Sequence, residues 1–156
     1  MAELVSGAKS GVISGSIYGV INTVVINVVV TGLIFPTVFP EFFVGGLRFL
    51  RITVVAVWLI GGLIIGAFGG LVFGLIFAVL HGRLPGKTPK IKGIILSIVF
   101  WVIFGLTQQL ALSARWPPEA VFLISMPIMT SLGTSVLWGI LLGTFWERLS
   151  LEPETS

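Results

Sequence analysis

The sequence predicts an all-α integral membrane protein with four transmembrane helices, and three observations lead to this fold class. Hydrophobic residues make up 56% of the 156 residues, and charged residues make up only 10%. The mean hydropathy of +1.13 is typical of membrane proteins and not of soluble domains. Four largely uncharged segments are each long enough to cross the hydrocarbon core, which takes about 20 apolar residues. We therefore expect a single transmembrane domain over residues 1–156.

Prolines separate the predicted spans at places where a missing backbone N–H costs little. Pro36 and Pro40 follow the first span, and Pro85 and Pro89 separate the second from the third. We expect the first span to be retained, because its apolar stretch exceeds the roughly 7–15 residues of a signal-peptide core. The four spans are predicted near residues 10–35, 52–81, 91–114 and 120–146.

The connections between the spans differ in charge and predict how the chain is oriented. Loop 36–51 is rich in phenylalanine and is expected to be external and to lie in the membrane interface. Loop 82–92 is basic, and residues 147–156 form a short polar tail. With four spans, this loop and both termini share one side, which collects six of the nine Lys and Arg residues. The positive-inside rule therefore places both termini in the cytoplasm of a multi-pass cell-membrane protein.

Small residues recur at every fourth position in the first two spans, and we call these positions the glycine rows. Apolar side chains gain little by touching each other instead of lipid, so membrane helices associate where glycine lets their backbones approach. We expect glycine-zipper packing through these rows and through two glycines of the fourth span. The predicted packing positions are Gly7, Gly11, Gly15, Gly19, Gly62, Gly66, Gly70, Gly74, Gly139 and Gly143.

The glycine rows leave open whether they pack helices within one chain or between chains. Each step of four residues turns a row by about 40°, so the row from Gly62 to Gly82 winds about 200° around its helix. One straight, parallel neighbour cannot cover such a row. Either the partner crosses at an angle, or different parts of the row face different helices.

An internal repeat is predicted when the two halves of the chain are aligned. Residues 70–84 lie over residues 135–149, which matches Gly74 with Gly139 and Arg83 with Arg148. A shift of 82 residues places the first span on the third, with Gly11 over Gly93. The sequence thus favours two repeated helical hairpins, although two glycine-rich hairpins can also align by composition alone.

Polar side chains within the spans are the candidate functional residues, because an amide or hydroxyl that faces lipid costs free energy. Two interpretations remain. Interhelical hydrogen bonds by such groups are ordinary packing interactions, whereas uncharged amides and hydroxyls can also line a path for a small neutral solute or an anion. Because the spans lack carboxylates, a proton-driven transporter is not expected. The candidate lining residues are Tyr18, Asn22, Asn27, Gln108 and Gln109.

The basic residues of the loops are expected to contact anionic lipid headgroups and not nucleic acid, because they are few and lie between spans. The expected headgroup contacts are Arg48, Arg51, Arg83, Lys87, Lys90 and Lys92. The chain has no cysteine and a single histidine. We therefore expect no catalytic residues, no metal site and no cofactor.

These observations favour a non-catalytic packing or accessory subunit of a homo- or hetero-oligomeric membrane complex. Its expected partners are the lipid bilayer and either further copies of the chain or other membrane subunits. The alternative is a passive channel or uniporter for a small neutral solute or anion. A lipid-binding protein is the third interpretation.

Overall fold

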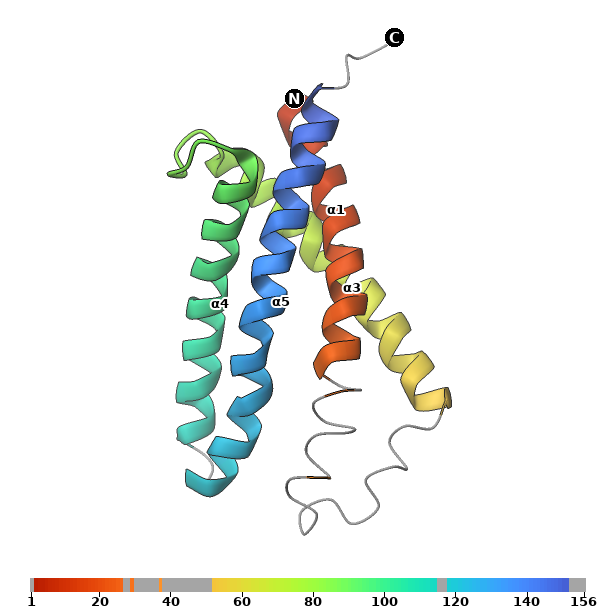
Figure 1. Cartoon of the computed structure of the whole chain (residues 1–156), viewed down its shortest axis with the longest axis vertical. Coiled ribbons are helices and arrows are strands. Elements are labelled where there is room, and N and C mark those ends of the chain that lie inside the picture. The colour runs from red at the N-terminus through yellow and green to blue at the C-terminus, as the bar shows by residue number, and fades with distance from the viewer. Residues whose placement is uncertain (1, 27–28, 30–36, 38–51, 115–117, 152–156) are drawn as a thin grey trace.

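The computed structural model describes residues 2–26, 29, 37, 52–114 and 118–151, and these include four long helices (Figure 1). The helical fold class is thereby confirmed. Within the described residues, three segments are long and apolar enough to cross a membrane, namely Glu3–Ile26, Val55–Leu80 and Pro89–Thr107. The fourth predicted span lies within a continuous helix, and its crossing of the membrane stays a prediction. The helices are α1 (Ala2–Thr23), α3 (Ile52–Leu80), α4 (Pro89–Ser113) and α5 (Pro118–Leu151).

Two helices extend beyond the predicted membrane spans. Helix α1 begins at Ala2, eight residues before the predicted start of the first span at residue 10. The negative charge of Glu3 in its first turn interacts favourably with the helix dipole. Helix α5 ends at Leu151, so the first part of the predicted polar tail 147–156 is helical. Glu147 there forms an ion pair with Lys90 of α4 at 3.5 Å. Except for Thr37, the predicted external loop 36–51 lies outside the described residues, and so do Arg48 and Arg51.

The helices form two antiparallel pairs, in which α1 packs against α3 and α4 packs against α5. Contact between α1 and α5 joins the two pairs. Helix α3 crosses the others obliquely, so its beginning lies apart from α4 and α5 (Figure 1). We call the end of the bundle where α1 begins and α5 ends the terminal end. The bundle is therefore closed near the terminal end and opens toward the start of α3.

The glycine rows of α1 and α3 face one another within the same chain. A Cβ added at Gly11 would lie 2.8 Å from the Gly74 Cα, and one added at Gly66 would lie 2.8 Å from the Gly19 Cα. The backbones are therefore in direct contact, because a side chain at these positions would overlap the neighbouring helix. The oblique crossing lets rows that wind around their helices stay in contact with each other.

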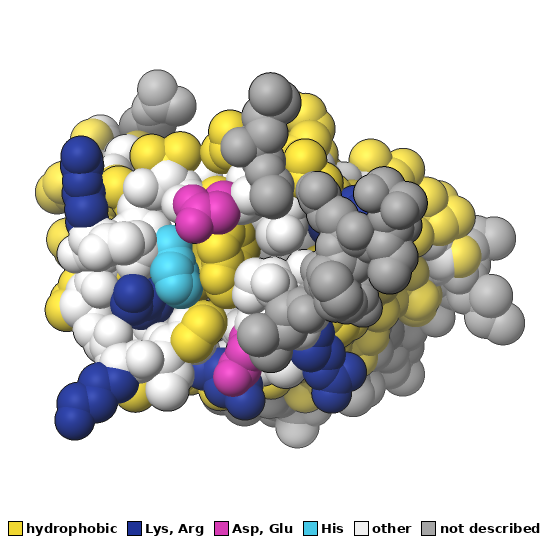
Figure 2. Space-filling view, turned by 90° about the horizontal axis from the view of Figure 1, so that it is seen from above, with side chains coloured by type: hydrophobic (Ala, Val, Ile, Leu, Met, Phe, Trp, Pro, Cys, Tyr) yellow, Lys and Arg dark blue, Asp and Glu magenta, His cyan; other side chains and the backbone are white. Residues whose placement is uncertain are grey.

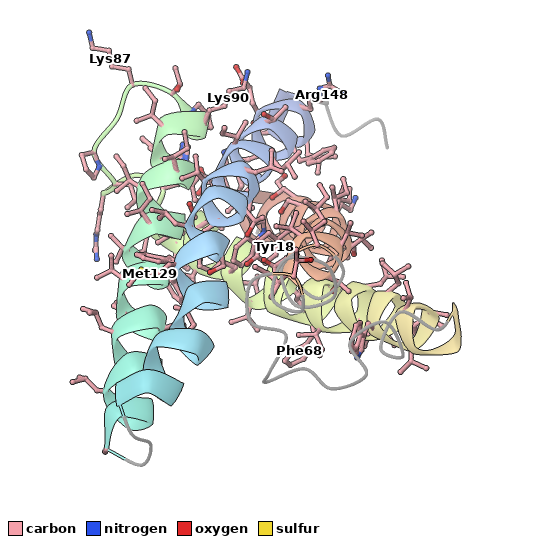
Figure 3. The ribbon with its side chains drawn as sticks, turned by 60° about the horizontal axis from the view of Figure 1, so that its bottom comes forward. Tyr18, Phe68, Lys87, Lys90, Met129 and Arg148 are labelled. Carbon is pink, nitrogen blue, oxygen red and sulfur yellow. The ribbon has the colours of Figure 1, made fainter. Side chains whose placement is uncertain are left out.

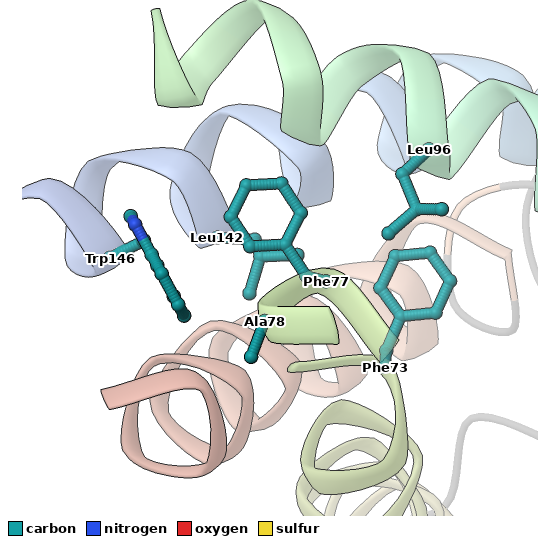
Figure 4. Packing of buried hydrophobic residues seen from close by; sticks show 6 residues of the cluster. All are labelled: Phe73, Phe77, Ala78, Leu96, Leu142 and Trp146. Carbon is teal, nitrogen blue, oxygen red and sulfur yellow. The ribbon is translucent and has the colours of Figure 1, made fainter. Parts of the chain in front are cut away.

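The buried apolar core lies where the second half of α3 meets α4 and α5 (Figure 4). Phe77 and Leu142 are fully buried at its centre, and Trp146 closes it toward the terminal end. The Phe73 ring contacts Phe100 of α4 edge-on, with ring centroids 4.5 Å apart. Large side chains therefore pack α3 against the α4–α5 pair, whereas direct backbone contact at glycines packs α3 against α1.

Candidate functional site

One cavity of the described structure lies between α3 and the α4–α5 pair, at the level where α3 leaves the bundle. Its volume is about 430 Å³. Phe68, which is 70% exposed, and Phe104, which is 59% exposed, are the outermost of the aromatic rings that line it. Figure 3 shows Tyr18 near the crossing of α1 and α3 and Phe68 on the opposite side of α3. We call this the aromatic cavity; its remaining lining residues are Gly69, Val72, Phe73, Ser97, Phe100, Trp101, Gly105, Ile128, Ser131, Ser135 and Trp138.

A second cavity of about 570 Å³ adjoins the first and lies along α1 and the first half of α3. The two cavities share Tyr18, Gly69 and Trp138 as lining residues. Gly69 has no side chain to separate the two cavities, and a Cβ added there would meet no atom within 4 Å. Small residues of α3 thus leave open space on the side of the helix that does not contact α1.

Stacked rings connect the three helices at the boundary between the cavities. The Tyr18 ring of α1 stacks on Trp138 of α5, with centroids 4.8 Å apart and planes 15° apart. Trp138 in turn stacks on Phe73 of α3 at a centroid distance of 4.1 Å. Such contacts stabilise a structure beyond the area that they bury. This ring column ties α1, α5 and α3 together.

The predicted polar lining is only partly brought together in the described structure. Asn22 lines the second cavity, and its Oδ1 accepts a hydrogen bond of 2.8 Å from the Thr134 hydroxyl of α5. Asn27 lies outside the described residues. Gln108 and Gln109 belong to α4, but their side chains lie outside the described part of the chain. Among the candidates, Tyr18 and Asn22 are therefore placed, and both contact α5.

Several polar groups of the aromatic cavity have no hydrogen-bond partner among the described residues. Ser135 is only 5% exposed, lines the cavity and makes no hydrogen bond to that part of the chain. The Tyr18 hydroxyl is likewise unpaired there, and the buried Trp138 Nε1 has no acceptor in the described structure. By contrast, Trp101 Nε1 is hydrogen-bonded at 2.9 Å to Ser131 Oγ. Unpaired polar groups cost free energy in an apolar environment. The wall formed by α1 and α5 therefore differs from the rest of the cavity, because Tyr18, Ser135 and Trp138 there lack hydrogen-bond partners among the described residues.

Sequence reasoning missed Ser135, Trp138 and Trp101 as cavity residues. The signal was present on the last helix, where Ser131, Ser135 and Trp138 recur at three- and four-residue spacing and so share one face. That spacing alone did not indicate a cavity, because the cavity exists only where α3 diverges from this face. The oblique path of α3 was not readable from any single segment.

Four of the six predicted headgroup contacts lie at the terminal end, where Lys and Arg side chains gather (Figure 2), and they divide into two groups. Lys90 pairs with Glu147, and Lys92 Nζ donates a hydrogen bond of 2.7 Å to the His81 carbonyl just beyond α3. Arg83 and Lys87 are exposed in the turn between α3 and α4. The first two cations therefore have protein partners among the described residues, and contact of the second two with headgroups stays a prediction.

His81 follows the last residue of α3 and is packed among aromatic rings. Its ring stacks on Trp146 with centroids 5.1 Å apart, and it meets Phe77 edge-on. Burial lowers the pKa of His81 below its ordinary value, and nearby Lys92 lowers it further, while Glu3 raises it. His81 Nδ1 is buried without a hydrogen-bond partner in the described residues. This environment favours the neutral imidazole.

Across the described residues, no group of three or more His, Cys, Asp or Glu side chains could hold a metal ion. The sequence-family comparison matches residues 9–156 to the family described as "Family of unknown function (DUF6789)". The chain matches no curated protein and no solved structure. Because the family match covers nearly the whole chain, the protein belongs to the DUF6789 family.

Proposed function

We propose that this member of the DUF6789 family is a non-catalytic subunit of a larger membrane assembly, homo- or hetero-oligomeric. The observation that carries the proposal is the position of the first half of α3, which packs against α1 and diverges from α4 and α5. An orientation with both termini in the cytoplasm belongs to the same proposal and rests on the charge bias of the loops.

The partner surface that we propose differs from the glycine rows, because those rows are occupied within the chain. It is the open face of α3, which we define by Gly61, Ile64, Phe68 and Gly69. Ile64 is 62% exposed, and a Cβ added at Gly61 or Gly69 would meet nothing within 4 Å. Exposed apolar residues alone only indicate contact with lipid. Glycines on an exposed face favour close approach of another helix, which supports an interface there.

Site-specific photocross-linking in native membranes tests this proposal, because the chain has no cysteine of its own. An Ile64→Cys variant would be labelled with a benzophenone maleimide and irradiated. Leu106→Cys is the matched control, since Leu106 of α4 is similarly exposed at 60%. We expect protein adducts at position 64 and lipid adducts at position 106.

The mass of the adduct at position 64 identifies the assembly. Twice the mass of the chain indicates a homo-oligomer, and addition of a different polypeptide indicates a hetero-oligomer. Lipid adducts alone at both positions would contradict the proposal, because α3 would then face the bilayer. Native mass spectrometry of gently extracted protein would give the stoichiometry.

A passive channel or uniporter remains the second candidate, because Tyr18, Asn22 and Thr23 line the second cavity. The Asn22–Thr134 hydrogen bond and the Tyr18–Trp138 stack are also what a packed interface requires, so we rank this function second. Solute flux into liposomes that an Asn22→Leu variant abolishes would favour the channel. Flux equal to that of protein-free liposomes would rule it out.

A further inference from the structure

We propose that the aromatic cavity is a binding site for a neutral lipophilic molecule that carries a ring and a hydrogen-bonding oxygen. This inference goes beyond the proposed role in an assembly, and the aromatic cavity shares Phe68 and Gly69 with the open face of α3. The inference rests on the two different walls of the cavity and on a buried hydroxyl without a partner.

The apolar wall comes from α3 and α4 and consists largely of phenylalanine rings. Phe73 and Phe100 meet edge-to-face, and Phe100 stacks further on Phe104 at a centroid distance of 5.7 Å. Phe68 and Phe104 are exposed at the outer edge, so a molecule dissolved in the hydrocarbon has access to the cavity. Aromatic walls of this kind favour a planar ring, because the ring can stack or meet the phenylalanine edges.

The polar wall comes from α1 and α5 and includes Ser135, Tyr18 and Trp138. Ser135 is buried to more than nine-tenths and has no hydrogen-bond partner among the described residues, whereas Ser97, Ser131 and Trp101 of the same cavity are hydrogen-bonded. Within the described structure, the unpaired polar side-chain atoms that are completely buried are His81 Nδ1 and Trp138 Nε1. The Ser135 hydroxyl is not among them, so it is accessible from the cavity. A ligand oxygen would form hydrogen bonds with the hydroxyls of Ser135 and Tyr18. In a soluble protein, water forms such bonds with buried polar groups.

The size and charge of the cavity exclude other occupants. A transmembrane helix is about 10 Å wide and rises 1.5 Å per residue, so a volume of 430 Å³ holds only about three to four of its residues. Among the described residues, no Lys, Arg, Asp or Glu lines the cavity, so a charged molecule would have no counter-charge there. A plain acyl chain would fill the space but leave the hydroxyls unpaired. A small neutral molecule with a ring and an oxygen satisfies both walls, and the volume lies within the range of ligand pockets.

Menadione and methylnaphthalene form the matched pair of probes, because they share a fused ring system and differ in the two carbonyl oxygens. The purified full-length protein in nanodiscs is titrated with menadione, and saturable quenching of tryptophan fluorescence gives its Kd. Displacement of menadione by methylnaphthalene gives the affinity of the hydrocarbon. We expect saturable binding, with menadione bound about fivefold or more tightly.

Two variants remove the proposed hydrogen bonds while keeping the shape of the cavity. We expect Ser135→Ala and Tyr18→Phe each to weaken menadione binding about fivefold and to leave the affinity for methylnaphthalene unchanged. Phenylalanine at position 18 retains the stack on Trp138. Equal losses for both probes, or menadione affinity unchanged in both variants, would overturn the proposed polar recognition. Absence of saturable binding to the native protein would overturn the site itself.

A filling variant locates the site without depending on hydrogen bonds. Gly69→Leu adds a side chain at the cavity wall, and Gly133→Leu adds the same side chain on α5 outside both cavities. A Cβ at either position meets nothing within 4 Å, so both variants are expected to fold. We expect Gly69→Leu to weaken menadione binding at least tenfold and Gly133→Leu to leave it unchanged. Equal affinities of the two variants would show that the probe binds elsewhere.

Discussion

The α1–α3 and α4–α5 pairs are both antiparallel, yet they differ in how far their backbones stay in contact. Between α1 and α3 the contact runs through all eight residues of the two glycine rows. Between α4 and α5 the comparable contacts are made by Gly93, Gly139 and Gly143, near the terminal end. Farther along, a Cβ added at Gly105 of α4 would lie at an ordinary van der Waals distance of 3.5 Å from Ile128. The extent of close contact thus follows the length of the run of small residues.

The two pairs also correspond to each other near the terminal end. Gly7 approaches Ala78 in the first pair, and Gly143 approaches Lys90 in the second. Under the predicted alignment, Gly143 stands in the place of Ala78, and residue 89 stands in the place of Gly7. This correspondence supports the predicted repeat, which stays a prediction. The aromatic cavity lies farther along, where α3 diverges from α4 and α5.

Gly70→Leu should have the largest effect on the unfolding free energy, because it forces apart α1 and α3, the pair with the longer backbone contact. A Cβ at this position would lie 2.7 Å from the Gly15 Cα, so the backbone itself would have to move. We expect loss of about 3 kcal/mol or more of the unfolding free energy, the upper end of overpacking effects. Unfolding in mixed micelles, followed by circular dichroism, measures it. Gly61→Leu on the open face of α3 is the control, and an equal loss in both variants would contradict the contact that we describe.

Gly139→Leu applies the same change to the α4–α5 pair and should cost less. An added Cβ would lie 2.6 Å from both the Gly93 carbonyl oxygen and the Ser97 Oγ. Because the close contact is confined to one end, the helices can splay there while the remainder stays packed, and we expect a loss of about 1–3 kcal/mol. The same unfolding assay measures it. A loss greater than that of Gly70→Leu would reverse the comparison between the pairs.

Thr134→Val tests the connection between the two pairs. It removes the 2.8 Å hydrogen bond to Asn22 and keeps the branched shape of the side chain. We expect a loss of about 0.6–1.7 kcal/mol, the range of interhelical hydrogen bonds in membranes. A double-mutant cycle with Asn22→Leu measures the interaction itself. Strictly additive effects of the two substitutions would show that the bond contributes nothing to the stability of the bundle.

The pH dependence that arises from His81 should be the smallest effect. Burial lowers the pKa of His81 in the folded state below its ordinary value of 6.5. As the pH falls through 6.5, the unfolded chain takes up a proton that the folded chain binds less readily, so the folded state loses stability until the pH passes below the folded pKa. We expect the unfolding midpoint to decrease modestly between pH 7 and pH 5. His81→Gln should flatten this decrease, and an unchanged slope in that variant would assign it to other groups.

Two of the predicted spans can be compared with helices whose ends local chemistry determines. The predicted span 52–81 compares with Ile52–Leu80, and 91–114 compares with Pro89–Ser113, because charges and Pro89 bound these segments. Helix α1 begins before the predicted first span, since the turns around Glu3 and Lys9 contain polar residues that a hydropathy criterion excludes. Polar residues do not prevent a helix from extending into the aqueous interface.

The candidate site was less accessible to sequence reasoning, for a physical reason. Tyr18 and Asn22 were identified because they are polar within an apolar segment, but their contacts with Trp138 and Thr134 join helices more than 100 residues apart in sequence. The aromatic cavity depends on the path of α3, which the glycine contacts with α1 impose. Such a path is a property of two packed helices together, and neither segment specifies it alone.

The contact between α1 and α3 also determines what genetic variation the protein can accept. Every replacement of glycine adds a Cβ, and at all eight row positions that atom would lie closer than 3.0 Å to the facing helix. No conservative replacement therefore exists along this surface, and a single-nucleotide missense change in any of these codons introduces a side chain with no space. Gly61, Gly69 and Gly133 have open space instead. Natural sequences should thus tolerate alanine or serine at these three positions while keeping glycine at the eight.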